Sequence, residues 1–383
     1  MALINYITQI QFEFGAIGLL KQQCERVGIR RPLIVTDRGV KAAGIIDTVL
    51  DALAHAGTVA LYDGTPSNPN EAAVREAVRA YKEGDCDGIV AVGGGSSIDL
   101  AKGVAVCATH DGPLQSFAVI EGGMDRITAR TAPVIAVPTT AGTGSEVGRG
   151  AILILDDGRK LGFHSWHLVP KTAICDPELT LGLPPLLTAA TGMDAVAHCM
   201  ETFMAPAVNP PADGIALDGL ERAWSHIERA TRDGGDRDAR FAMMSASMQG
   251  AMAFQKGLGC VHSLSHSLGG ANPKLHHGTL NAVFLPAVVE FNASAPSIVK
   301  ERRLERMAHA MGLAVTGSPA GAIADAIRTM NKRLGLPTGL AAMGVETAMF
   351  ERIIDGAMAD HTHKTNPRAA TRDDYARMLG ESM

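Results

Sequence analysis

The feature that most limits the fold is a regular alternation, in the first half of the chain, of short apolar runs with stretches of helical spacing. Strand-like runs lie at 32–36, 59–62, 88–92 and 134–137, and helices are expected at about 40–55 and 70–83. Because these runs are apolar at nearly every position, they are typical of parallel strands covered on both faces by helices. The turn signal at 156–159 adds a small antiparallel hairpin near 150–163.

The second half has a different pattern. From Leu183 onward it is rich in Ala, Leu, Met and Glu at helical spacing, with few strand-like runs, and the Gly-Leu-Pro-Pro segment at 182–185 marks the border. The length of 383 residues also suits two domain-sized units. We therefore predict an α/β domain at 1–182 and an all-helical domain at 183–383.

Composition excludes several classes of function. The net charge is -5 and no basic tract occurs, so nucleic acid is not an expected partner. No apolar run reaches the roughly 20 residues that span a bilayer, and residues 1–6 lack the basic and apolar regions of a signal peptide. The six cysteines form no regular framework, which indicates free thiols. We expect a cytoplasmic protein that is not bound to a membrane.

A glycine-rich turn follows the third strand-like run and opens a helix. Glycines let the backbone approach a phosphate, and the helix N-terminus offers unpaired N–H groups to it. The alternative is an ordinary strand-to-helix turn with a serine cap. The G-x-G-x-x-G pattern is not met, because Ile98 occupies the third glycine position. The candidate cofactor-binding residues here are Gly94, Gly95, Ser96, Ser97 and Asp99.

A second loop, at 138–146, also follows a strand-like run and is dense in hydroxyl groups. Thr139, Thr140 and Thr143 can bond a diphosphate or a ribose, while the alternative is a helix N-cap in which Thr143 and Glu146 form a capping box. Two such loops at the carboxyl ends of parallel strands mark the usual ligand edge of the sheet. The first domain is therefore predicted to bind a dinucleotide.

The choice of dinucleotide depends on Asp37, which ends the first strand-like run. A carboxylate at this position can accept a hydrogen bond from an adenosine ribose 2′-hydroxyl and would repel a 2′-phosphate, which favours NAD. A role as N-cap of the following helix is equally compatible with the sequence. The neighbouring Arg38 leaves NADP open.

Acidic and imidazole side chains gather in the helical half at spacings that suit one metal ion. Asp194 and His198 are four residues apart, so they project from one face of a helix, and His262 and His266 repeat this spacing on a second helix. The pair at 276–277 opens a third helical run. A lone histidine is more often an ordinary core or surface residue, but such a group, buried without an ion, would leave several polar atoms unpaired.

One carboxylate with three imidazoles suits a divalent ion such as Fe²⁺ or Zn²⁺. Such an ion leaves room for a substrate oxygen and lowers the pKa of a bound alcohol, which favours the loss of a hydride to a nicotinamide. The ligand types do not identify the metal, because Zn²⁺ generally binds such sites more tightly than Fe²⁺.

With these motifs in this order, the chain resembles the group III, iron-containing alcohol dehydrogenases over nearly its whole length. The matching segments are Gly93 to Asp99, Pro138 to Glu146, Gly192 to His198 and His277 to Ala282. The resemblance implies a dehydroquinate-synthase-like architecture with the active site in a cleft between the two domains. It also implies an enzyme that oxidises alcohols with NAD and a divalent metal.

By this resemblance, the metal ligands are Asp194, His198, His262 and His277, and His266 is a catalytic residue near the nicotinamide that relays the proton of the alcohol. The loop before His277 is one residue longer than in some relatives, which leaves His276 as an alternative ligand, although the His-Gly-x-x-Asn-Ala pattern favours His277. The residues that fall where the family contacts NAD(H) are Asp37, Asn68, Gly95, Ser96, Thr139, Thr140, Thr143 and Lys160.

Within the family, the chain is most similar to bacterial 4-hydroxybutyrate dehydrogenases, which implies interconversion of 4-hydroxybutyrate and succinate semialdehyde. A substrate with a carboxylate far from its hydroxyl needs a cationic anchor. The stretch 361–368 departs from many relatives and is either part of the substrate pocket or a solvated loop. The candidate anchors are Arg149, His164, His167, His363 and Lys364.

Two other functions within this architecture, and one outside catalysis, remain open at this point. A general short-chain alcohol or diol dehydrogenase would share every motif, and a dehydroquinate-synthase-like lyase would share the fold, NAD and the metal. A non-catalytic sensor is disfavoured by the intact ligand set. Relatives are often dimers or larger, so a homo-oligomer is expected.

Overall fold

The computed structural model describes residues 8–53 and 59–383 and divides them into two compact units. One unit contains the described residues up to Thr140 together with Gly144–Leu183, and the other contains Ala141–Thr143 and Pro184–Met383. These units differ from the expected division at 182/183 in two respects. The border falls after Leu183, and the short segment Ala141–Thr143 groups with the helices. Helix α3 was expected to run to His55, which lies outside the described residues.

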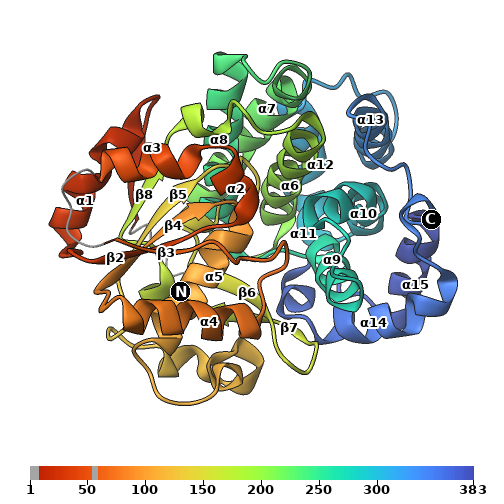
Figure 1. Cartoon of the computed structure of the whole chain (residues 1–383). Helices are drawn as coiled ribbons and strands as arrows, with labels where there is room; N and C mark the ends of the chain where they lie inside the picture. Colours follow the sequence, from red (N-terminus) through yellow and green to blue (C-terminus); the bar gives the residue numbers. More distant parts are fainter. Residues whose placement is uncertain (1–7, 54–58) are drawn as a thin grey trace. The chain divides into compact units, whose positions relative to one another are not determined.

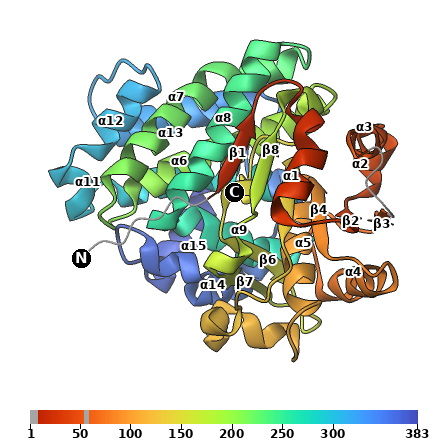
Figure 2. The same ribbon diagram turned by 90° about the vertical axis from the view of Figure 1, so that its left-hand side faces the viewer.

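The first unit is built on a parallel sheet, whose strands are coloured from red to yellow-green in Figure 1. Within the described residues the strand order is β1-β8-β5-β4-β2-β3, and every neighbouring pair is parallel. Figure 2 shows the edge pair β1 and β8, two four-residue strands that the sequence analysis did not predict. The strands are β1 Gln9–Phe12, β2 Pro32–Val35, β3 Ala60–Tyr62, β4 Gly88–Gly93, β5 Val134–Pro138 and β8 Thr172–Cys175.

Alternate residues of the central strands enter two different cores, one on each face of the sheet. Leu33 and Val35 pack with helices α4 (Glu71–Glu83) and α5 (Gly95–Cys107), whereas Ile34 packs with α1 (Leu20–Val27) and α3 (Ile45–Ala52). All three side chains are fully buried. This confirms the reading of the apolar runs as strands covered on both sides, and each such side chain contributes roughly 1.5–3 kcal/mol by burial.

Two local expectations were wrong. The single helix expected at about 40–55 is two helices, α2 (Arg38–Ala42) and α3, because Gly44 between them adopts a left-handed conformation with φ of 77° that ends a helix. The capping box suggested for Thr143 with Glu146 is absent. Instead, Gly144 precedes the short 3-10 helix η5 (Ser145–Val147), which has no side-chain cap. The predicted hairpin is present as the antiparallel pair β6 (Gly150–Ile154) and β7 (Lys160–His164).

The second unit is helical throughout its long run. Helix α6 is buried along most of its length, so it forms the centre of this unit, and α7, α8 and α10 pack against it. Prolines at Pro184 and Pro185 suit the start of α6, where the first N–H groups have no partner inside the helix. The main helices are α6 Pro185–Met204, α7 Pro210–Arg232, α8 Arg237–Ala253, α9 Cys260–Ala271 and α10 His277–Asn292. The later ones are α11 Pro296–Lys300, α12 Arg303–Ala310, α13 Pro319–Arg333, α14 Phe350–Ala359 and α15 Arg372–Glu381.

None of the helices in the described part of the chain is both long and apolar enough to cross a lipid bilayer.

Candidate metal centre and cofactor loops

Helix α6 presents two of the predicted metal ligands on one buried face. Asp194 and His198 are each only 3% exposed, and their spacing of four residues brings them one helical turn apart. The turn of α6 that carries them is otherwise lined by Ala, Val and Met, so no other polar side chain of that turn competes for them. The predicted placement on one helix face is what the structure has.

Two hydrogen bonds fix how His198 and His262 are oriented. The Nδ1 of His198 lies 3.3 Å from the carbonyl oxygen of Gly142, and the Nδ1 of His262 lies 2.5 Å from Oε2 of Glu201. A carbonyl oxygen can only accept, so the proton of His198 is on Nδ1, and a carboxylate imposes the same tautomer on His262. Burial, with repulsion from His198, holds the pKa of His262 well below its usual value, so this ring is neutral. Each ring is left with a lone pair on Nε2.

These lone pairs converge with the carboxylate. The Nε2 atoms of His198 and His262 are 3.0 Å apart. Oδ1 of Asp194 lies 4.0 Å from Nε2 of His198, 3.9 Å from Nε2 of His262 and 3.8 Å from Nε2 of His277. Ligand atoms that share an ion at about 2.1 Å lie roughly 3.0–3.5 Å from one another in octahedral or tetrahedral geometry. The spacing found here is close to that range.

The donor set therefore fits a divalent cation. Two imidazole lone pairs that face each other at 3.0 Å in a buried space repel unless a positive charge is shared between them. Asp194, His198 and His262 form a candidate metal group by distance alone, with all three side chains buried. His277 approaches the same carboxylate from α10 and remains 25% exposed, so it is the most accessible of the four side chains.

Asn281 is a residue at this centre to which sequence reasoning gave no role. Its Nδ2 donates to Oδ1 of Asp194 at 2.7 Å and lies 3.2 Å from Nε2 of His262 and 3.1 Å from that of His277. The amide is fully buried, one helical turn after His277 on α10. In the sequence, Asn281 was noted only as one position of the His-Gly-x-x-Asn-Ala pattern, which gives no information on its contacts. Between His276 and His277, it is His277 whose Nε2 reaches the group.

His266 stands next to the metal group on α9. Its ring stacks on that of His277 with centroids 5.3 Å apart, and its Nδ1 donates to Oδ2 of Asp360 at 3.0 Å. The ring of His361 also stacks on that of His266, with centroids 6.1 Å apart. Although burial raises the pKa of Asp360, its interactions with His266, His361 and Thr362 outweigh burial and hold that pKa below its usual value. Asp360 and His361 were not predicted, because they lie far from His266 in the sequence.

The glycine-rich turn leaves the start of α5 open. Helix α5 begins at Gly95 after Gly94, and no side chain caps it, so the alternative reading as a serine cap does not hold. The hydroxyl of Ser96 donates to the carbonyl of Ser67 at 2.6 Å, and Ser97 is fully buried. The uncapped N–H groups of a thirteen-residue helix can bind an anion.

The first residues of the second loop and three isolated candidates lie around this helix start. The N–H of Thr139 donates to the carbonyl of Gly93, and a Cβ at Gly94 would lie 3.1 Å from Oγ1 of Thr140, so the two loops touch. Asp37 caps α2 through the N–H of Val40 at 3.0 Å and also accepts from the hydroxyl of Ser97 at 3.3 Å. The Nζ of Lys160 donates to Oδ1 of Asn68 at 2.9 Å.

Asp99 differs from the other candidates at this turn, since both of its carboxylate oxygens are occupied inside the unit. Oδ1 accepts from the hydroxyl of Ser145 at 2.6 Å, and Oδ2 accepts from the N–H of Ile152 at 2.9 Å. The fully buried Lys102 completes this cluster by donating to backbone carbonyls at Gly148 and Gly150. Asp99 therefore ties α5 to η5 and β6, and its position is explained without a cofactor.

Comparison with known proteins identifies the family. The model for iron-containing alcohol dehydrogenases matches residues 8–177, and the model for the C-terminal part of the Fe-containing alcohol dehydrogenase family matches residues 188–383. The chain belongs to the iron-containing alcohol dehydrogenase family. It is an oxidoreductase, as the sequence analysis predicted, and its fold is the dehydroquinate-synthase-like fold expected of this family.

Three relatives define where the chain stands within the iron-containing alcohol dehydrogenases. It is 66% identical to the 4-hydroxybutyrate dehydrogenase of Cupriavidus necator, over 100% of both chains. It is 34% identical to the NAD-dependent methanol dehydrogenase of Bacillus methanolicus, over 96% of both chains. The crystal structure of a 1,3-propanediol oxidoreductase superposes with a TM-score of 0.92 at 33% identity, over 100% of both chains.

The candidate substrate anchors of this dehydrogenase lie in both units. In the first, Arg149 is half-buried with its guanidinium 4.7 Å from the ring of Trp166, while His164 ends β7 and His167 is exposed. In the second, Nδ1 of His363 lies 2.9 Å from the hydroxyl of Tyr375, and Lys364 is exposed. Burial lowers the pKa of Arg149, and no carboxylate among the described residues pairs with it.

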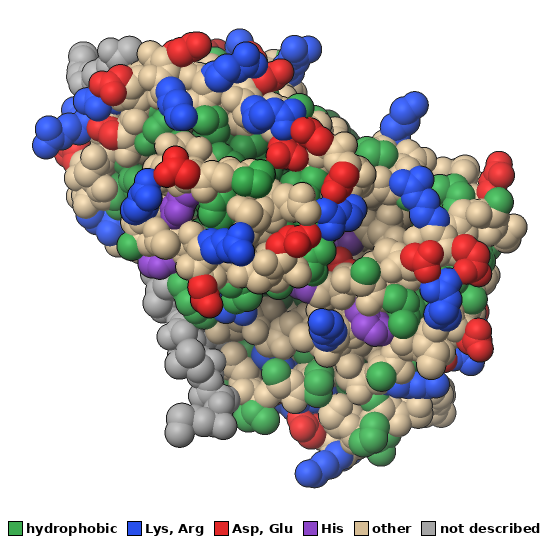
Figure 3. Space-filling model, turned by 90° about the horizontal axis from the view of Figure 1, so that it is seen from below, with side chains coloured by type: hydrophobic (Ala, Val, Ile, Leu, Met, Phe, Trp, Pro, Cys, Tyr) green, Lys and Arg blue, Asp and Glu red, His purple; other side chains and the backbone are tan. Residues whose placement is uncertain are grey.

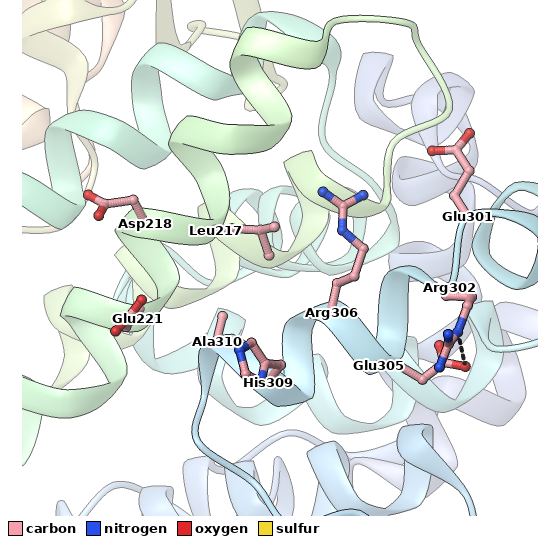
Figure 4. Close-up of a pocket in the computed structure, with 9 residues that line it drawn as sticks. All are labelled: Leu217, Asp218, Glu221, Glu301, Arg302, Glu305, Arg306, His309 and Ala310. Atoms are coloured by element: carbon pink, nitrogen blue, oxygen red, sulfur yellow. Dashed lines mark ion pairs between the residues drawn. The ribbon is translucent and has the colours of Figure 1, made fainter.

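A surface pocket of about 600 Å³ lies between α7 and α12, but it contains none of the predicted site residues. Figure 4 shows its lining, in which Arg302 and Glu305 form an ion pair with a nitrogen-to-oxygen distance of 3.6 Å. On the face drawn in Figure 3, Lys and Arg side chains are interspersed with Asp and Glu rather than gathered in one field. Neither feature adds a residue to the candidate site.

Proposed function

We propose that this chain is an NAD-dependent, iron-type alcohol dehydrogenase that interconverts 4-hydroxybutyrate and succinate semialdehyde. The observation that carries the chemistry is the convergence of three imidazole Nε2 atoms on the carboxylate of Asp194. The substrate is supported by the 66% identity, along the whole chain, to a 4-hydroxybutyrate dehydrogenase. The use of NAD is supported by the likeness to an NAD-dependent relative and by the open start of α5.

In the proposed mechanism, Asp194, His198, His262 and His277 would hold the divalent ion. When bound, the ion would supply a Lewis acid that lowers the pKa of the alcohol, and NAD would be the hydride acceptor. Nδ1 of His266 donates a hydrogen bond to Asp360, so its Nε2 is the atom that would take the proton of the alcohol. Fe²⁺ is the ion proposed from the family, although the same ligands accept Zn²⁺.

The dinucleotide is proposed to bind at the start of α5 and the loop that follows β5. The backbone N–H groups at Gly94, Gly95 and Ser96 would hold the diphosphate, with the hydroxyls of Thr139 and Thr140 as further donors. The N–H of Ser97 already donates to the carbonyl of Gly94, so Ser97 would contribute through its hydroxyl, and Thr143 is retained as a proposed contact from the family. Asp37 remains half-exposed while it caps α2, so its carboxylate can still meet a ribose and repel a 2′-phosphate. The paired side chains of Asn68 and Lys160 complete the proposed contacts.

The substrate carboxylate is proposed to pair with one of the five candidate cations. Arg149 is the strongest of them, because a half-buried guanidinium without an acidic partner among the described residues gains most from an anionic ligand. An ion pair of this kind contributes about 1.5–3 kcal/mol, or roughly 10- to 100-fold in kcat/KM. His164, His167, His363 and Lys364 remain proposed alternatives.

The test is a steady-state assay of NADH with anaerobically purified, Fe²⁺-reconstituted protein. We expect kcat/KM for 4-hydroxybutyrate to exceed that for 1-butanol by roughly 10-fold or more, and Arg149→Gln to reduce only the former. A comparable or higher value for 1-butanol or 1,3-propanediol would instead support the general alcohol or diol dehydrogenase. Metal-dependent binding of NAD with no net NADH from any alcohol would support the lyase.

The remaining expectations are proposed with this function. All six cysteines are free, which supports a reducing, cytoplasmic location. A homodimer or larger homo-oligomer is proposed from the family, and sedimentation at several protein concentrations tests it. The division into a dinucleotide-binding domain at 1–182 and a metal-binding domain at 183–383 is likewise retained as a proposal.

A further inference from the structure

Glu201 is a buried carboxylate that belongs to neither the ligand set nor the cofactor loops. It is 2% exposed and lies on α6, three residues after His198 and seven after Asp194, so all three face the same side of the helix. Its Oε1 accepts from the N–H of Val261 at 2.8 Å, and its Oε2 accepts from Nδ1 of His262 at 2.5 Å. Both oxygens of one side chain therefore act on the first turn of α9.

This turn has no cap of its own. Helix α9 begins at Cys260 after Gly259, and no side chain of the helix caps it. A Cβ at Gly259 would lie 2.9 Å from Oε1 of Glu201 and 2.4 Å from Oδ1 of Asn366, so the close approach of these two groups requires a glycine. Asn366 accepts from the N–H of Cys260 at 3.2 Å. The start of α9 is thus held by two side chains from elsewhere, one of which also holds a metal ligand.

We propose that Glu201 is a positioning residue that sets the metal affinity of the centre. By accepting from Nδ1 it fixes both the tautomer and the rotation of His262, and it keeps the lone pair of Nε2 directed toward Asp194 and His198. By accepting a hydrogen bond from the N–H of Val261, Glu201 also fixes the position of the first turn of α9, which carries His262. This inference rests on the metal-binding role proposed above but not on any substrate.

The test is metal affinity, measured on the full-length protein after its metal has been removed. Competition with a chromophoric chelator gives Kd for Co²⁺, and the visible spectrum of the Co²⁺ form reports its coordination. In Glu201→Gln, the amide N–H₂ would face one of the two N–H donors, of Val261 or His262, that the carboxylate now accepts from. We therefore expect a roughly 10- to 100-fold higher Kd for Co²⁺ and a changed spectrum. Glu201→Asp keeps the charge but withdraws it by one methylene, and we expect a smaller increase.

Asp213→Asn is the matched control. Asp213 is also a carboxylate of the helical unit, but its ion-pair partners are Lys256 and Arg303 rather than members of the metal group. It should lose stability while Kd for Co²⁺ stays within about twofold of the wild type. The proposal is overturned if Glu201→Gln, or Glu201→Asp where the former does not fold, binds Co²⁺ like the wild type. It is also overturned if Asp213→Asn raises Kd equally.

These outcomes separate the inference from the proposed function. Wild-type protein that binds Co²⁺ tightly but turns over no alcohol would contradict the proposed reaction and leave the role of Glu201 intact. Normal turnover by Glu201→Gln, with an unchanged Kd for Co²⁺, would contradict the role of Glu201 and leave the proposed reaction intact.

Discussion

The contact between α10 and α6 at Gly278 gives a prediction that tests the metal centre without touching a ligand. A Cβ at this position would lie 2.2 Å from the carbonyl oxygen of Ala190 and 3.2 Å from Cβ of Asp194, both on α6. Ordinary contacts between such atoms are about 3.5 Å, so Gly278→Ala requires α10 to move away by on the order of 1 Å. That movement would lengthen the 3.8 Å between His277 and Asp194.

Two opposing terms set the stability of Gly278→Ala. Alanine gains up to about 1 kcal/mol over glycine in a helix, while overpacking against a backbone oxygen costs about 1–3 kcal/mol. We therefore expect the metal-free protein to lose roughly 1–2 kcal/mol of unfolding free energy. Since metal ligands tolerate little displacement, we also expect Kd for Co²⁺ to rise by on the order of tenfold or more.

Gly214→Ala is the matched control for this prediction. Gly214 lies in α7 and is exposed, and a methyl group at this position would have no other atom within 4 Å. The same substitution should therefore be neutral here or stabilise by about 0.5–1 kcal/mol. Urea unfolding of the metal-free proteins and chelator competition give the two quantities. If Gly278→Ala matches Gly214→Ala in stability and the wild type in Kd, the close packing at the metal centre is refuted.

Three further predictions concern the rest of the molecule. Lys102→Met removes the buried ammonium that donates to the buried carbonyls of Ser145 and Gly148, so urea unfolding should show a loss of about 3–5 kcal/mol. A loss below about 1 kcal/mol would contradict this. Burial raises the pKa of Cys199 and of Cys24 from 9.0 to about 12, so neither should react with a thiol reagent at about pH 8 in the native protein, and rapid labelling would disprove the burial. Because these folded-state pKa values exceed the unfolded one, the stability they contribute is complete below about pH 9 and should decline as the pH rises toward about 12. Removal of the metal with a chelator should lower the melting temperature. Zn²⁺ at about 100 times its Kd should then restore about 2.7 kcal/mol of unfolding free energy. Recovery with Mg²⁺ alone would argue against a nitrogen-rich site.

The sequence was most informative where chemistry and helical spacing agree. Asp194 with His198, and His262 with His266, were recognisable because polar side chains recur at one-turn spacing in apolar surroundings. The central strands were recognisable for a related reason, since continuous apolar runs have few alternatives to a buried parallel sheet. Strand β1, at the edge of the sheet, and its neighbour β8 carried no such signal, because Gln-Ile-Gln-Phe and Thr-Ala-Ile-Cys are not continuous runs of large apolar residues.

What the sequence could not show is how distant segments meet. Asp360 orients His266 across 94 residues, and the carbonyl of Gly142 orients His198 across 56. A backbone carbonyl has no residue signature at all, and Asp360 could only be ranked among many surface carboxylates. Glu201 did leave a signal, because it is a carboxylate in a run of apolar residues on the same helix face as Asp194. A search for all polar side chains on the face of α6 that carries Asp194, rather than for family motifs alone, would have found Glu201.

The buried carboxylates of α6 also bear on the binding of a cation at this centre. Asp194 and Glu201 are almost completely buried, and burial raises the pKa of Glu201 to about 7. A cation bound by Asp194 and His262 would favour the ionised form of Glu201, because His262 links Glu201 to the same group. The burial of two carboxylates on one face of α6 therefore favours the binding of a cation between α6 and α9.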